Sequence, residues 1–128
     1  MFITKISLPV IIFFWIVFTG FHIFFKYTEL YWFYLWLDIP MHLAGGFLVV
    51  MTWYFLRQVM AGGKIFSQKF FHPLTILAIM MIGWEIYKYM IGDIVSDNYV
   101  QDTILDLIMG TVGGLIAFRL FKSSKIRE

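Results

Sequence analysis

Four long apolar segments constrain the fold of this chain more than any other feature. They cover residues 6–25, 38–56, 74–91 and 102–121. At about 1.5 Å per helical residue, such segments match a bilayer hydrocarbon core of roughly 30 Å. Only 14% of the 128 residues are charged, and so small a soluble domain cannot bury a composition that is 61% hydrophobic. We therefore predict an all-α, polytopic membrane protein with four transmembrane helices in a single domain, residues 1–128.

The ends of the first apolar segment argue for a retained helix and an interfacial segment. The apolar stretch at residues 6–25 is longer than that of a signal peptide, and no small-x-small cleavage site follows it. Residues 27–37, which connect the first two predicted spans, are too few to cross a bilayer and are rich in Tyr and Trp. This composition is typical of a segment at the membrane–water interface.

Basic residues predict the orientation of the spans. With four spans, the N-terminus, the second connection and the tail at residues 122–128 lie on one side of the membrane. That side holds eight of the ten basic residues, namely Lys5, Arg57, Lys64, Lys69, Arg119, Lys122, Lys125 and Arg127. The other side holds the acidic residues Glu29, Asp38, Asp93, Asp97 and Asp102. The positive-inside rule therefore predicts a multi-pass plasma-membrane protein with both termini in the cytoplasm.

Ionisable residues recur at one depth on three of the predicted helices. Asp38 and His42 are one helical turn apart at the outer end of the second span, and Asp102 and Asp106 repeat this step on the fourth. Glu85 lies roughly 10 Å inside the outer end of the third span. Such residues cost about 2.5–3.5 kcal/mol at the centre of a membrane helix and are functional candidates by default. We expect the five to form one cluster open to the outside.

Each of these residues also has a purely structural interpretation. Asp38 and Asp102 lie where helix N-caps are needed. His42 would satisfy its ring nitrogens by bonding to Asp38 or to a carbonyl group. Glu85 would pair with Lys88, one turn closer to water. These alternatives remain open at the level of sequence.

Glycines continue the same helix faces toward the cytoplasm. They are expected to let the second, third and fourth spans pack closely, while the aromatic first span faces lipid. These packing glycines are Gly45, Gly46, Gly110, Gly113 and Gly114.

The order of these features resembles the VanZ-like membrane proteins. That family combines an aspartate and a histidine four residues apart, a glutamate in a later helix, and a last helix with Asp-x-x-x-(Asn or Asp) and glycines. The matching residues between positions 38 and 121 are Asp38, His42, Glu85, Asp102, Asp106, Gly110, Gly113 and Gly114. The resemblance implies an integral membrane protein that acts at the cell envelope. Asp106 stands where many members carry asparagine, and the basic residue often found before the last helix is missing.

The first functional hypothesis is an enzyme or binding site for a lipid or lipid-linked substrate. With no cysteine in the chain, a divalent cation such as Zn²⁺, Mn²⁺ or Mg²⁺ would have carboxylate and imidazole ligands. Its ligands would be Asp38, His42, Glu85, Asp102 and Asp106, and the candidate catalytic residues are His42, Glu85 and Asp106. Alternatively, His42 acts as a general base without metal, with its tautomer fixed by Asp38.

Two other classes of function remain open. Carboxylates lining a path in a homo-oligomer would serve proton or cation transport. The inner halves of the second and third spans are apolar apart from Thr52 and Thr75, which argues against a continuous path. The third class is a structural protein whose aromatic outer segment contacts a partner. The lipid bilayer is an expected partner in all three classes, and nucleic acid in none.

Overall fold

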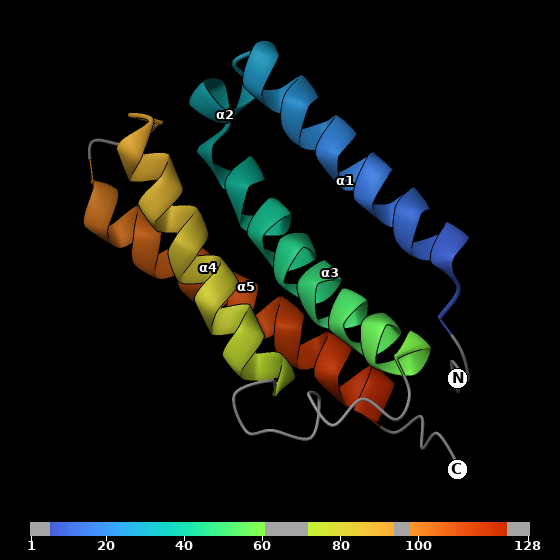
Figure 1. Cartoon of the computed structure of the whole chain (residues 1–128). Coiled ribbons are helices and arrows are strands. Elements are labelled where there is room, and N and C mark those ends of the chain that lie inside the picture. Colours follow the sequence, from blue (N-terminus) through green and yellow to red (C-terminus); the bar gives the residue numbers. More distant parts are fainter. Residues whose placement is uncertain (1–5, 61–71, 94–97, 123–128) are drawn as a thin grey trace.

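The computed structural model describes residues 6–60, 72–93 and 98–122, and every element in these ranges is helical. The chain passes back and forth along one direction, so consecutive long helices run in opposite senses (Figure 1). The prediction of an all-α fold is confirmed. In order, the elements are α1 (Leu8–Tyr27), α2 (Leu30–Phe33), the 3-10 helix η1 (Leu35–Leu37), α3 (Asp38–Val59), α4 (Pro73–Met90) and α5 (Tyr99–Lys122).

Within the described residues, three helical segments are long and apolar enough to cross a membrane. They are α1, the continuous stretch Leu35–Val59 that contains α3, and α5. Helix α4 has 18 residues and carries Glu85 and Lys88, which lower its overall apolar character. Length and composition therefore support three of the four predicted spans.

The closest contact in the bundle joins α3 to α5 through glycine. A Cβ atom added to Gly46 would overlap the carbonyl group of Gly110, and one added to Gly113 would overlap the carbonyl group of Leu43. Only hydrogen occupies these positions, so the two backbones touch directly. Small residues serve this purpose in membrane proteins, where no hydrophobic effect drives helices together.

Helix α4 packs against the same pair of helices. A Cβ atom added to Gly114 would overlap the Leu77 side chain, and one added to Gly110 would lie 2.8 Å from the sulfur of Met81. Val50, Leu77 and Ala117 are almost completely buried where α3, α4 and α5 meet. Helices α3, α4 and α5 thus form the core of the bundle, with the contacting glycines on α3 and α5.

Helix α1 is attached to this core mainly through α3. Ile11 is the only residue of α1 that is buried. Trp15 Nε1 donates a hydrogen bond to Thr52 Oγ1 at 2.9 Å, and Gln58 makes two hydrogen bonds with the backbone of Ile6, just before α1. Gly45 faces Phe18, whose ring lies 3.4 Å from an added Cβ. The remaining, mostly exposed surface of α1 suits contact with lipid.

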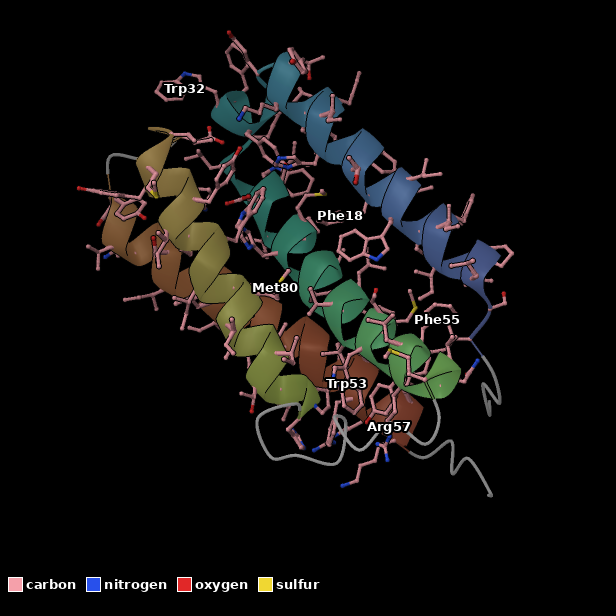
Figure 2. The ribbon with its side chains drawn as sticks, in the orientation of Figure 1. Phe18, Trp32, Trp53, Phe55, Arg57 and Met80 are labelled. Carbon is pink, nitrogen blue, oxygen red and sulfur yellow. The ribbon has the colours of Figure 1, made fainter. Side chains whose placement is uncertain are left out.

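The aromatic connection folds into two short helices at one end of the bundle. The chain turns at Glu29, whose φ of 57° is left-handed, and then forms α2 and η1. Trp32, Tyr34 and Trp36 are exposed, which fits the predicted interfacial position. Trp32 reaches from α2 toward the end of α4 (Figure 2).

Three of the eight basic residues used to predict orientation are described. They are Arg57, Arg119 and Lys122, and they lie toward the opposite end of the bundle, where α3 and α5 finish. Arg57 is labelled there in Figure 2, with its guanidinium carbon 5.5 Å from the centre of the Trp53 ring. Six further charged residues used to predict orientation, five basic residues and one aspartate, lie outside the described residues. They are Lys5, Lys64, Lys69, Asp97, Lys125 and Arg127, and residues 123–128 of the predicted tail lie outside as well.

We expect Gly46→Ala and Gly113→Ala each to destabilise the protein by roughly 1–3 kcal/mol, because the new methyl group must push α3 and α5 apart. Gly83→Ala is the matched control, because a Cβ at Gly83 meets nothing within 4 Å. Thermal unfolding in detergent micelles measures the difference. Equal melting temperatures for the three variants would contradict the direct backbone contact.

Candidate functional site

The glycine contact sets the register that brings His42 and Asp106 together. Gly46 lies one turn after His42 on α3, and Gly110 lies one turn after Asp106 on α5. Because Gly46 touches Gly110, the same offset one turn earlier places His42 opposite Asp106. His42 Nε2 is 3.1 Å from Asp106 Oδ2, and the Asp106 side chain is only 2% exposed. The packing of the bundle thus creates the polar contact.

His42 faces a second carboxylate from its own helix. Its Nε2 atom lies 3.5 Å from Asp38 Oδ1, one turn earlier on α3. Asp106 is therefore the nearer of the two partners, although the sequence pattern favours Asp38 as the residue that orients the imidazole. The imidazole lies between carboxylates from two different helices.

Lys88 connects α4 to the same carboxylate. Its Nζ atom lies 2.8 Å from Asp106 Oδ2 and 3.1 Å from Glu85 Oε1. Thr103 of α5 also donates a hydrogen bond from Oγ1 to Glu85 Oε2 at 3.4 Å. The predicted Glu85–Lys88 pair is present, but it belongs to a network that extends to Asp106.

Asp38, His42 and Asp106 form the group best placed to hold a metal ion. One ligand atom from each lies within 4.8 Å of the others. Glu85 and Asp102 belong to no such group among the described residues. Glu85 reaches the cluster through Lys88, whereas Asp102 lines a cavity beside the aromatic segment. Three of the five predicted ligands thus converge directly.

Neither aspartate at the start of a helix is its N-cap. The N-cap of α3 is Leu37, and Asp38 is already helical. Helix α5 begins at Tyr99, so Asp102 lies inside its first turn. Capping is therefore a wrong interpretation of both residues, because η1 leads directly into α3 at Asp38 and α5 starts three residues before Asp102. A carboxylate in the first turn is still favoured by the helix dipole.

The charges of the cluster do not balance. Asp38, Glu85 and Asp106 would carry three negative charges when ionised, whereas Lys88 and a protonated His42 would supply two positive ones. At least one carboxylate then lacks a compensating charge in a partly buried site. Burying an uncompensated charge is costly, so the arrangement favours either protonation of one carboxylate or binding of a cation.

Two cavities meet at this cluster. The first, of about 350 Å³, is bordered by the aromatic segment and by charged side chains, including Lys26, Lys88 and Asp102. We call it the outer cavity, because it lies at the end of the bundle, and we call the second the inner cavity. The inner one, of about 280 Å³, lies between α1, α3, α4 and α5 and has His42, Glu85 and Asp106 in its wall. Asp38 lines both cavities. The cluster is therefore bordered by a polar space on one side and a more apolar space on the other.

His22 and Tyr31 are neighbours of the site that the sequence pattern does not reveal. His22 Nδ1 lies 3.0 Å from the Tyr31 hydroxyl, and its ring centre lies 5.8 Å from that of Trp84. Burial raises the pKa of the Tyr31 hydroxyl, with a further contribution from nearby aspartates, so this group stays neutral. His22 has no acidic residue one turn away in sequence, and Lys26 at that spacing points to no site, so only the contact between helices identifies it.

Comparison with known proteins identifies a family. The family model described as predicted membrane protein (DUF2238) matches residues 2–125. Neither the curated proteins nor the solved structures include a match to this chain.

Lys88→Met is expected to destabilise the protein by roughly 3–5 kcal/mol, because it leaves Glu85 and Asp106 without their shared cation. Adding Glu85→Gln should recover part of the lost stability, since it removes one of the two carboxylates that lack a cationic partner.

Lys26→Met is the control for this prediction. Lys26 Nζ pairs with Asp93 at 3.0 Å, but its side chain is 48% exposed, so the expected loss is below about 1 kcal/mol. Thermal and denaturant unfolding in micelles provide the comparison. Similar losses for the Lys88 and Lys26 variants would contradict a buried network at Asp106.

Proposed function

We propose that this chain, which belongs to the DUF2238 family of predicted membrane proteins, binds a divalent cation at Asp38, His42 and Asp106. In this proposal the site opens to the extracytoplasmic side and acts on a lipid-linked or other envelope substrate. The observation that carries the proposal is the convergence of the three ligand atoms within 4.8 Å. The unbalanced negative charge around them supports it.

The ligand types suit a hard or borderline cation. Two carboxylates and one imidazole leave coordination positions for water or substrate, as in catalytic rather than structural sites. A divalent cation bound there would supply a nucleophilic hydroxide near neutral pH. Glu85 would serve as general base, and Lys88 would stabilise negative charge on a substrate. His42 as a metal-free general base, oriented by Asp106 and Asp38, is the alternative for the same reaction class.

We further propose that α4 crosses the membrane as a fourth span. Its Leu77 packs on Gly114, and its Lys88 reaches Asp106, so contacts with α5 extend along most of its length. Glu85 is buried in the bundle and Lys88 nearly so, so their charges are not presented to lipid. Four spans, with the basic ends of α3 and α5 inside, support cytoplasmic termini and a plasma-membrane location.

The VanZ-like resemblance belongs to this proposal. Asp38, His42, Glu85 and Asp106 are four of the residues that carry it, and they occupy one connected cluster. Asp102, the fifth charged residue of the pattern, lines the outer cavity and has a position suited to a substrate head group.

Transport and a purely structural role are the competing proposals. Transport needs polar groups below the cluster, but there the inner cavity is lined mainly by aromatic and aliphatic side chains. A structural role is favoured by the 2.8 Å contact between Lys88 and Asp106, which already gives this carboxylate a cationic partner.

Cation binding is the direct test of the proposal. Protein purified without chelator should bind about one equivalent of Zn²⁺ or Mn²⁺, measured by titration calorimetry and elemental analysis. His42→Ala and Asp106→Asn should weaken binding by more than about tenfold, since each removes a ligand.

His72→Ala is the matched control, because this exposed histidine precedes α4 at the opposite end of the bundle. It should leave the affinity unchanged. If no cation binds to the wild type, and the His42 and Asp106 variants lose only thermal stability, the structural role is correct instead.

A further inference from the structure

We infer that the inner cavity holds one hydrocarbon chain of an outer-leaflet amphiphile whose polar end lies at the Asp38–His42–Asp106 cluster. This inference rests on the proposed function, because it names the class of substrate that the same site would receive.

The long direction of the cavity follows the helices. Its lining on α3 extends from Asp38 to Val49, and its lining on α1 extends from His22 to Trp15. These stretches of helix correspond to roughly 10–17 Å, about a third to a half of the hydrocarbon thickness of a bilayer. A lipid chain lies in this same direction, and in the orientation proposed above the polar end of the cavity faces the outer leaflet.

The polarity of the lining changes from one end of the cavity to the other. The outer end carries the carboxylates Asp38, Glu85 and Asp106, whereas the inner part is lined by side chains such as Phe18 and Met80. Water in the inner part would find few hydrogen-bonding partners, so this part favours an apolar occupant. A polar end followed by an apolar stretch matches an amphiphile in its ordinary membrane orientation.

The cavity is accessible from the side of the bundle. Met80 and Trp84 of α4 line it, yet they are 55% and 40% exposed. Phe18 lies on the side of α1 that faces α3, Met80 lies on the side of α4 that faces α3 (Figure 2), and both residues line the cavity. An amphiphile therefore has a route from the surrounding leaflet between α1 and α4, without leaving the membrane.

The volume of the inner cavity fits a hydrocarbon chain but not an α-helix. An α-helix with side chains is about 10 Å across, so even two turns of it occupy more than the 280 Å³ available. A single hydrocarbon chain is much thinner. The outer cavity of 350 Å³, which shares Asp38 with the inner one, provides room for the head group.

Photocrosslinking in nanodiscs tests this inference. The probe is a phospholipid with a diazirine in the middle of one acyl chain, and adducts are located by mass spectrometry. Wild-type protein should give saturable adducts at Trp15, Phe18 and Met80. In Gly45→Leu these adducts should be lost, because the new side chain enters the space beside Phe18.

Gly83→Leu is the matched control, since a side chain at Gly83 extends into open space and should leave the adducts intact. Met80→Trp provides a second way to fill the cavity from an exposed position, should Gly45→Leu fail to fold. The inference is overturned if adducts form only at outward-facing residues such as Ile16 and Ile79. It is also overturned if they are equal in all variants, or if a second copy of the chain crosslinks into the cavity.

Cation titration of the same variants separates this inference from the proposed function. Gly45→Leu retains all three candidate ligands, so it should bind the cation as the wild type does while losing the lipid adducts. Cavity adducts without cation binding would support a bound hydrocarbon chain and refute the metal proposal. Cation binding without cavity adducts would support the metal proposal and refute the bound hydrocarbon chain.

Discussion

The buried carboxylate of Asp106 is the interaction on which the polar part of this structure depends. Its Oδ2 atom lies within 3.1 Å of both His42 Nε2 and Lys88 Nζ, so one oxygen connects α3, α4 and α5. A carboxylate that is 2% exposed in a membrane bundle is stable only with such partners. Asp38 then lies beside His42, and Glu85 beside Lys88. The cluster therefore joins the helices and forms the candidate site at once.

The glycine contact below the cluster makes this arrangement possible. Gly46 and Gly113 let α3 and α5 touch through their backbones, which is closer than any larger residue would permit. The same register aligns His42 with Asp106 one turn above. Helix α1, by contrast, makes fewer contacts with the core, and the cavity beside it remains accessible from the α4 side. Tight packing on one face and open packing on the other thus place the candidate site beside a cavity with exposed side chains in its wall.

Much of this architecture could be predicted from the sequence, because its causes are local. Apolar segments of spanning length predict the helices, and the one-turn spacing of Asp38 and His42 places both on one helix face. The central position of Lys88 was harder to predict, since its contact with Asp106 depends on how α4 rotates against α5. The same holds for the separation of Asp102 from the three converging ligands, and for the contact of His22 with Tyr31.

Anomalous diffraction from crystals grown with Mn²⁺ or Zn²⁺ is the most direct test of the central claim, that Asp38, His42 and Asp106 form a cation site. The account predicts an anomalous peak between the His42 imidazole and the carboxylates of Asp38 and Asp106. The account would be contradicted if no peak appears there while His42 and Lys88 both remain paired with Asp106.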